Sequence, residues 1–414
     1  MKKLIAFALA CFTLTAFTLT ALSQSTQQLK RDMYGIASDA TEGRFTGSPG
    51  YLKAAHYVAG QLRRSGIETR LQAVPFIWDN YNGSSITINH KNYLHEGGNF
   101  VVLRRSGTAI GGWIVLREMP DSAATEHLVR RKMAGVIVLP NEQQASDWET
   151  TVIRQYRFGY MHYAADYSAS NAQLNVVLIS PVLAGRIKSD PKPIVKLSFI
   201  ADSVNGYNVI AKIPGTDKSV KDQVIIAGAH LDHIGRCGTH IYNGANDDAS
   251  GCVALMNAAR YFGQHRAGIP LMLVFYCGEE LNLLGSRYFM DHPPVPVKNI
   301  RMNINLEQIG SKHRSFQGVW ALGDLRFQKD FFESGGMFDA ADLKFTGIDS
   351  VREVLSNTDS YSFMKKDVPS LLLGSGGFDE HHTTADKIDL IDFPHLQKAG
   401  LLLCRLLKTL ADQK

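Results

Sequence analysis

Residues 224–251 read VIIAGAHLDHIGRCGTHIYNGANDDASG, and this stretch predicts a buried strand that ends at a functional site. The apolar, β-branched run Val224-Ile225-Ile226 is typical of such a strand. His230 and Asp232 follow at its end, and a glycine-rich, polar loop then leads to Asp247. Ligands of open α/β sheets bind at the carboxyl ends of the strands, and imidazole with carboxylates is a donor set typical of zinc sites. The stretch therefore predicts a zinc site at one edge of a sheet.

Strand and helix signals mostly alternate from Tyr207 to the end of the chain, which predicts a largely parallel sheet with helices on both faces. The expected strands are 207–213, 223–230, 270–277, 300–307, 318–322 and 369–373, and the expected helices are 249–263, 283–291, 325–335 and 393–411.

Three further strands of this half end in residues that can bind metal or protons. They place Glu279 and Glu280, then Glu307, and finally His381 and His382 at the same sheet edge. So many acids would repel one another unless divalent cations compensated their charge. Two histidines and three carboxylates can hold two zinc ions if one carboxylate bridges them. A further carboxylate must stay off the metal to accept a proton from water, so the adjacent Glu279 and Glu280 can divide these roles.

Six motifs together carry a resemblance to the M28 family of zinc aminopeptidases, in order and in spacing, across roughly residues 27–75 and 204–400. They are GRFTGSPG (43–50), GAHLDH (228–233), NGANDDASG (243–251), GEELNLLGS (278–286), NLEQIG (305–310) and HHTTAD (381–386).

The resemblance implies two Zn²⁺ ions and a particular set of ligands. One zinc would be held by His230, Asp247 and Glu307, and the other by Asp247, Glu280 and His382, with Asp247 as the bridge.

The resemblance also implies catalytic roles and a fold. Glu279 would be the general base, and Asp232 would orient His230 through a hydrogen bond. The fold class would be α/β, with a mixed, mostly parallel central sheet sandwiched between helices and a smaller β-rich or α+β inserted domain. The insert, residues 86–198, resembles a degenerate protease-associated domain.

Three positions depart from the family pattern. Glu307 replaces the usual Asp and remains a competent ligand, and Asp248 replaces the usual Asn and adds a charge beside the metals. His381 stands where the family usually has a Tyr that stabilises the oxyanion. An imidazole N–H can serve as that donor, so His381 is expected to have a catalytic role.

The first residues predict export. Residues 1–23 combine Lys2-Lys3 with an apolar stretch and small residues before a cleavage site near Ser23/Gln24, as in a secretory signal peptide. An uncleaved membrane anchor is the alternative, and lipidation at Cys11 is not favoured. The expected domains are 1–23 as signal peptide, 24–85 with 199–414 as the catalytic domain, and 86–198 as the insert. The expected location is periplasmic or extracellular.

Net charge limits the classes of binding partner, and cysteine content indicates which disulfide could form. Removal of residues 1–23 deletes two lysines and lowers the net charge of +5 to +3, which argues against nucleic acid and against an anionic membrane as partners. No further apolar span is long enough to cross a membrane. Four cysteines remain without CxxC spacing, and Cys237 and Cys252 can pair in an oxidising compartment.

Several other residues are interpreted as structural. His162, His233 and His240 are expected to have packing or surface roles, and Ser250 is expected to cap the helix that follows it. The loop 43–50 is at least as well explained as a plain helix connector. Residues Thr358-Asp359-Ser360 resemble a family segment that lines the site.

These observations predict a secreted, two-zinc aminopeptidase that acts on peptides with a free N-terminus, because acids around the metals favour a charged α-amine. The motifs do not specify an oligomeric state. A one-zinc glutaminyl cyclase, which resembles the chain at HLD, EE and the final HT, is the first alternative. A catalytically silent binding protein on the same scaffold is the second.

Overall fold

The chain forms two compact units in the computed structural model. The larger unit comprises Met1–Val74, Gly206–Gly235 and Ile241–Lys414, and the smaller comprises Pro75–Asn205 and Arg236–His240. The structure describes residues 26–95, 98–106, 111–155, 159–164, 166, 172–187, 192–237, 239–311, 318–323, 343–375 and 378–412. The expected signal peptide and the expected helix 325–335 lie outside these residues.

Within the described ranges, the largest sheet has nine strands and belongs mainly to the larger unit. Its strands are β1 (Glu68–Asn80), β7 (Met161–Tyr163), β10 (Ile200–Ile213), β11 (Val224–His230), β14 (Leu271–Tyr276), β15 (Ile300–Glu307), β16 (Val319–Gly323), β17 (Leu343–Gly347) and β18 (Ser370–Gly374). They lie in the order β17-β16-β18-β15-β11-β14-β10-β1-β7. The four central strands β18, β15, β11 and β14 are parallel, whereas β16 and β10 pair antiparallel with β18 and β14. The predicted mixed, mostly parallel sheet is confirmed.

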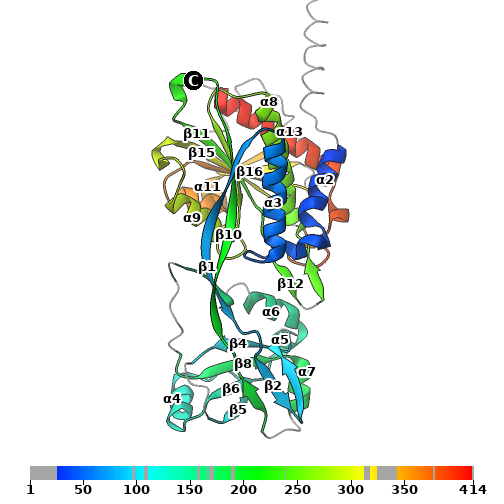
Figure 1. Cartoon of the computed structure of the whole chain (residues 1–414), viewed down its shortest axis with the longest axis vertical. Helices are drawn as coiled ribbons and strands as arrows, with labels where there is room; N and C mark the ends of the chain where they lie inside the picture. The colour runs from blue at the N-terminus through cyan, green and yellow to red at the C-terminus, as the bar shows by residue number, and fades with distance from the viewer. Residues whose placement is uncertain are drawn as a thin grey trace, which may run out of the picture. The chain divides into compact units, whose positions relative to one another are not determined.

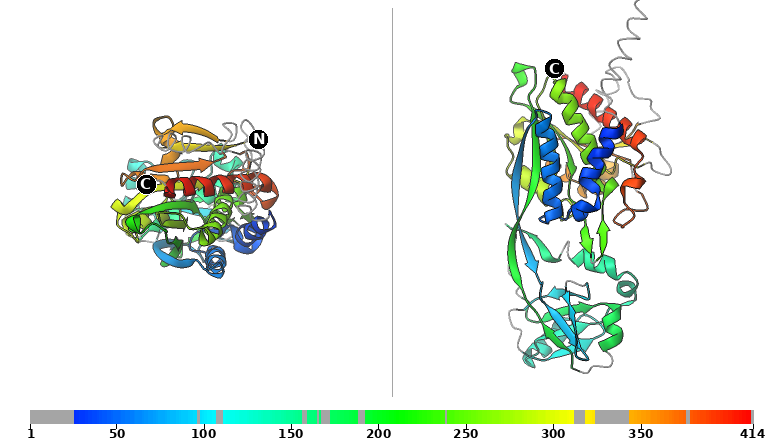
Figure 2. Two further views of the ribbon diagram at one scale, coloured as in Figure 1. Left: turned by 90° about the horizontal axis from the view of Figure 1, so that it is seen from above. Right: turned by 45° about the vertical axis from the view of Figure 1, so that its right-hand side comes forward.

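Helices cover both faces of this sheet (Figure 1). The long helices α2 (Thr26–Ala37), α3 (Pro49–Arg64), α8 (Ser250–Gln264) and α13 (Phe393–Asp412) pack together on one face, as Figure 2 also shows. The other face carries α9 (Leu284–Asp291), α11 (Ile348–Ser356) and α12 (Ser360–Met364). Small residues such as Gly251, Ala254 and Ala258 let α8 lie between the sheet and α13, so this helix is buried along most of its length.

The central strands bring their carboxyl ends to one edge. All residues of β11 and β14 are buried, as expected for parallel strands covered on both faces. His230, the last residue of β11, pairs with Tyr276 at the end of β14. Glu307, the last residue of β15, pairs with Gly374 at the end of β18. The register therefore places the ligand-bearing ends of separate strands beside one another.

The smaller unit has its own sheets and core. Phe100, Tyr160 and Val177 belong to a buried cluster inside it. Its four-stranded sheet has the order β4-β8-β6-β5 and its three-stranded sheet the order β3-β2-β9. The strands are β2 (Ser85–Ile88), β3 (Lys91–Leu94), β4 (Phe100–Arg104), β5 (Trp113–Leu116), β6 (Gly135–Val138), β8 (Asn175–Ile179) and β9 (Ile194–Lys196), and the helices are α4 (Ser122–Arg130), α5 (Glu142–Ser146), α6 (Trp148–Gln155) and α7 (Pro181–Ile187). Its likeness to a protease-associated domain stays a prediction.

Two expectations about the whole chain can be compared with the structure. Cys237, Cys252, Cys277 and Cys404 are free thiols, so Cys237 and Cys252 are not paired. Among the described residues, no helix is both long and apolar enough to cross a membrane.

Candidate metal centre

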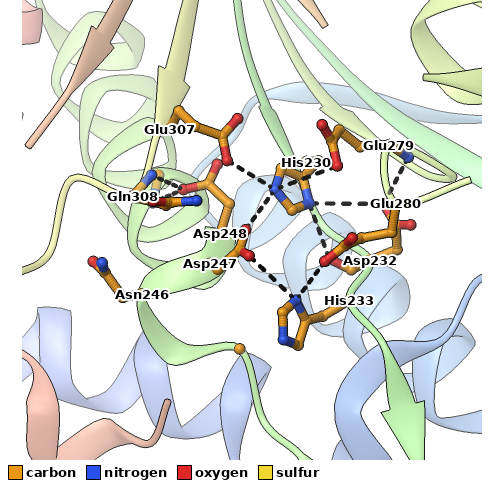
Figure 3. A network of polar contacts seen from close by, with 12 residues as sticks. His230, Asp232, His233, Asn246, Asp247, Asp248, Glu279, Glu280, Glu307 and Gln308 are labelled. Carbon is orange, nitrogen blue, oxygen red and sulfur yellow. Dashed lines mark hydrogen bonds and ion pairs between the residues drawn. The ribbon is translucent and has the colours of Figure 1, made fainter. Parts of the chain in front are cut away.

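His230 presents one ring nitrogen to the centre of the site. Its side chain is fully buried, and its Nδ1 lies 3.0 Å from the main-chain carbonyl oxygen of Asp232. Since a carbonyl only accepts, Nδ1 carries a proton, and Nε2 is the ring nitrogen that faces the neighbouring carboxylates. Burial lowers the pKa of His230, but the charges of Glu307 and Glu279 and the hydrogen bonds with Asp247 and Glu307 raise it well above the usual value. Nε2 lies 3.0 Å from Asp247 Oδ1 and 3.2 Å from Glu307 Oε1 (Figure 3). Nε2, once it has lost its proton, is therefore the atom that a metal ion would bind.

Asp232 fixes its neighbours in two ways. Its main-chain carbonyl makes the hydrogen bond to His230, while its carboxylate oxygen lies 3.9 Å from the same ring nitrogen. That carboxylate instead accepts a hydrogen bond of 3.1 Å from the main-chain N–H of Glu279. Burial raises the pKa of Asp232 to about 6. Asp232 therefore connects the end of β11 to the loop that follows β14.

Asp247 lies between two groups of donors. Its Oδ1 faces His230, and its Oδ2 lies 3.1 Å from His381 Nε2 and 3.2 Å from His382 Nε2. Burial alone would raise the pKa of Asp247, but hydrogen bonds from these three histidines hold it well below the usual value. The carboxylate is thus ionised and offers one oxygen to each side.

The main chain around Asp247 is held by a second carboxylate. Asp386 accepts hydrogen bonds from the N–H of Asn246 at 2.8 Å and from the N–H of Asp247 at 3.0 Å. Burial raises the pKa of Asp386 to about 7. The last residue of the HHTTAD motif therefore positions the ligand loop through its backbone.

A second group of donor residues lies around the other oxygen of Asp247, and it consists of Glu280, His382 and His233. Glu280 Oε1 lies 3.2 Å from His382 Nε2 and 2.8 Å from His233 Nδ1. His233 Nδ1 also lies 3.8 Å from Asp247 Oδ2. Burial lowers the pKa of His233, so its ring is neutral. His233, which the sequence analysis assigned to packing, thus lies among the expected ligands.

Glu279 lies in the group of donor residues around His230. Its Oε2 is 3.9 Å from His230 Nε2, and its side chain is 12% exposed. Burial, together with the charges of Glu307 and Glu280, raises its pKa well above the usual value for glutamate. Glu279 therefore lies near the ligand atoms and is partly accessible to solvent, and its raised pKa favours proton binding.

Two groups of donor atoms can each hold a metal ion, because the ligand atoms within each group lie within 4.8 Å of one another. They are His230, Glu279 and Glu307, and separately His233, Asp247, Glu280 and His382. Neutral imidazoles with carboxylates suit zinc. Glu307 Oε2 is buried and has no hydrogen-bond partner in the described part of the chain, which leaves it available to a cation. The donor set fits two zinc ions.

Two residues that depart from the family pattern, Asp248 and His381, lie at different positions around the centre. Asp248 accepts hydrogen bonds of 3.0 Å from the N–H groups of Gly251 and Gln308, and its pKa is raised well above the usual value by burial. His381 is 44% exposed on its side chain and stacks on His382 with ring centroids 3.8 Å apart. Asp248 therefore supports the backbone, while His381 lies at the solvent side of the centre.

The expectation that Ser250 caps its helix is wrong. Its hydroxyl donates to the carbonyl of Asn246 at 2.8 Å and accepts from the N–H of Ile309 at 3.0 Å. The free N–H of Gly251 is instead satisfied by Asp248. Ser250 is itself the first residue of α8 and joins this helix to the segment after β15.

Asp359 is a buried acid that sequence reasoning placed only in the general surroundings of the site. It is 0% exposed, and neither carboxylate oxygen has a hydrogen-bond partner within the described residues. Burial raises its pKa to about 7, and the negative charges of Glu307 and Asp232 add to this while the charge of His230 opposes it. Asp359 therefore adds to the acidic character of the centre without contacting the ligand atoms.

Arg44 ties the two ligand loops together. It is fully buried, and its Nε donates to the carbonyl of Leu231 at 2.7 Å. Its terminal nitrogens donate to the carbonyls of Asn243 and Gly244, the latter at 2.8 Å, and of Ile36 at 3.5 Å. Leu231 lies between His230 and Asp232, and Gly244 lies three residues before Asp247. The loop 43–50 is therefore more than a helix connector, although a lone Arg in a glycine-rich turn gave no indication of this.

Replacing Arg44 by methionine is expected to lower the free energy of unfolding by about 3 kcal/mol or more, because several buried carbonyls lose their donors at about 1–3 kcal/mol each. Urea unfolding of the zinc-loaded protein measures this change. Arg64→Met at the exposed end of α3 is the matched control and should stay within about 0.5 kcal/mol of the parent. Equal unfolding midpoints for the two variants would contradict the role given to Arg44.

Comparison with known proteins agrees with this geometry. Residues 208–407 match the model of peptidase family M28. The chain is 33% identical over 124 residues to leupeptin-inactivating enzyme 1 of Streptomyces exfoliatus, covering 29% of this chain and 26% of that protein. It is 27% identical over 233 residues to leucine aminopeptidase 1 of Coccidioides posadasii, covering 50% and 57%. The chain thus spans between about a quarter and just over half of the length of these relatives.

A solved structure confirms the fold class over nearly the whole chain. The zinc aminopeptidase BSAP from Bacillus subtilis superimposes with a TM-score of 0.63, at 17% identity, and covers 94% of this chain and 96% of that one. The mixed sheet with helices on both faces is therefore shared with a solved structure.

Proposed function

We propose that this chain, whose residues 208–407 match the model of peptidase family M28, is a zinc-dependent aminopeptidase that hydrolyses the first peptide bond of peptides with a free N-terminus. The proposal rests above all on Asp247, whose two oxygens face His230 on one side and His382 on the other. A carboxylate in this position is what a pair of metal ions about 3.5–4 Å apart requires.

His230, Asp247 and Glu307 would hold one zinc, and Asp247, Glu280 and His382 the other. When bound, such ions lower the pKa of water and polarise the scissile carbonyl. The side chains that surround them then decide where the proton goes and where the developing charge is stabilised.

Glu279 is the proposed general base. Its carboxylate lies beside the ligand atom of His230, and its backbone is fixed by Asp232. It would take the proton from the attacking water and return it to the leaving amine. The raised pKa of Glu279 strengthens it as a proton acceptor near neutral pH.

His381 is the proposed donor to the oxyanion. It is held by its stacking on His382 and remains partly exposed at the mouth of the centre. An imidazole N–H at this place can donate to the carbonyl oxygen as negative charge develops.

We also propose that the chain is exported, with cleavage near Ser23/Gln24, and that residues 86–198 form a protease-associated-like insert. The sequence pattern of residues 1–23 supports export.

Acetylation of the substrate's N-terminus tests the exopeptidase character. The zinc-loaded protein is expected to release the first residue from aminoacyl-p-nitroanilides and free-amine peptides, and to lose more than about 100-fold in kcat/KM on the N-acetylated forms. The reason is that the buried acids around the metals favour a charged amine. Equal cleavage of acetylated and free peptides would overturn the proposal.

Two other measurements, cyclisation of N-terminal glutamine and the number of zinc ions per chain, separate the alternatives. Cyclisation of N-terminal glutamine by protein holding one zinc per chain would favour a glutaminyl cyclase. Absence of turnover in protein holding two zinc ions would favour a silent binding protein.

A further inference from the structure

The second donor group contains one histidine more than the family pattern places there. We propose that His233 is a fourth protein ligand of the second zinc, together with Asp247, Glu280 and His382. This inference rests on the proposed zinc-dependent function and deepens it, because it makes the two metal positions unequal.

The distances among these four donors fit one tetrahedral ion. His382 Nε2 lies 3.2 Å from both Asp247 Oδ2 and Glu280 Oε1, while His233 Nδ1 lies 2.8 Å from Glu280 Oε1 and 3.8 Å from Asp247 Oδ2. Zinc bonds of about 2.0–2.1 Å in a tetrahedron place neighbouring donors about 3.3–3.4 Å apart. The observed separations lie on both sides of that value, and all four ligand atoms lie within 4.8 Å of one another.

The ring of His233 lies close to the carboxylates of Glu280 and Asp247 but makes no hydrogen bond to them. The side chain is fully buried, and neither ring nitrogen makes a hydrogen bond of acceptable geometry to any described residue. A buried polar group without a partner is costly. A cation bonded to Nδ1 would remove that cost on the side that faces Glu280 (Figure 3).

The backbone also gives the ring a fixed position. The ring packs on Gly244, where an added Cβ would lie 2.4 Å from Cγ and 2.5 Å from Cδ2 of His233, and Gly244 has φ +55°. Only glycine fits this close approach without strain. The carbonyl of Gly244 is held in turn by Arg44. The glycine before the ligand loop therefore makes room for the imidazole against the metal position.

A fourth protein ligand changes the role of the second position. Zinc sites closed by four protein ligands are structural, whereas catalytic sites keep a position open. The first position would have His230, Glu307 and the near oxygen of Asp247 as ligands, with Glu279 beside them. With a fourth protein ligand, the second zinc would mainly fix the loops that carry Asp247 and His382, and the first position would keep the open coordination that the chemistry needs.

Metal affinity of His233→Ala tests the assignment without relying on activity. Competitive chelator titration should show two zinc sites in the parent, of which one weakens by at least about 10–100-fold in the variant while the other is unchanged. Cobalt in the weakened position should lose the intense visible absorption of four-coordinate geometry. His265→Ala, an exposed histidine of the larger unit, is the matched control and should change neither site.

Two further results decide between a ligand and a hydrogen-bonding role. His233→Asn keeps a polar side chain beside Glu280 but is a poor ligand, so it should weaken the same site, and full affinity in this variant would overturn the inference. If the alanine variant does not fold, a zinc anomalous-difference map of the parent replaces it. A zinc–Nδ1 distance of about 2.0–2.1 Å is expected, and one beyond about 3 Å would overturn the inference. Zinc binding of this kind without peptide cleavage would leave the inference intact and remove only the proposed activity.

Discussion

Glu279→Gln is expected to lower kcat/KM for aminoacyl-p-nitroanilides by about 10²–10⁴-fold while both zinc ions stay bound. The amide preserves the shape of the side chain but cannot accept the proton from the attacking water. Glu279 Oε2 lies 3.9 Å from His230 Nε2, beside the expected zinc ligands. Steady-state kinetics and metal analysis on the same sample measure both parts of this prediction.

The neighbouring residue supplies the matched control. Glu280 Oε1 lies against both His382 and His233, so Glu280→Gln should lose activity together with one zinc. Retention of activity by Glu279→Gln, or loss of its zinc, would show that the roles of the two adjacent glutamates have been assigned wrongly.

Asp247→Asn should abolish activity and weaken both zinc sites, because a single carboxylate faces both donor groups. Partners outside the ligand shell already cost 10–100-fold in metal affinity, so the loss for the bridging ligand should exceed about 100-fold. Isothermal titration of the metal-stripped protein with zinc measures the two affinities.

Asp222→Asn is a suitable control for this variant, since Asp222 is exposed just before β11 and faces solvent. It should bind zinc as the parent does. If Asp247→Asn lost only one ion and kept the other at full affinity, Asp247 would not be a bridging ligand.

Much of the fold could be predicted because the central strands are continuous apolar runs that end in polar residues. The expected strand 300–307 matches β15, and the expected helix 393–411 matches α13 to within one residue. Parallel pairing then places His230 and Glu307 at the same edge without further information. The strand expected at 207–213 is longer in the structure, beginning at Ile200.

The residues that hold the metal-binding side chains and loops in place could not be predicted in the same way. His233 lies in a loop beyond the strand, where the alternation of side chains no longer tells which direction a residue faces. Arg44 binds carbonyl oxygens, and any residue supplies those, so no motif identifies its partners. The unusual residues at 381 and 307 were visible in the sequence, but only distances between atoms place His381 against Asp247.

Arg44 also has a consequence for how the protein is made. Apart from Ile36, its carbonyl partners lie 187 to 200 residues further along the chain. During synthesis from the amino end, the arginine leaves the ribosome long before the loops it binds, and the smaller unit is translated in between. The centre therefore can assemble only after this long loop closes, which is entropically slow. A nascent chain of the first 230 residues contains the arginine but not Asp247, so the proposed bridging ligand is still missing at that stage.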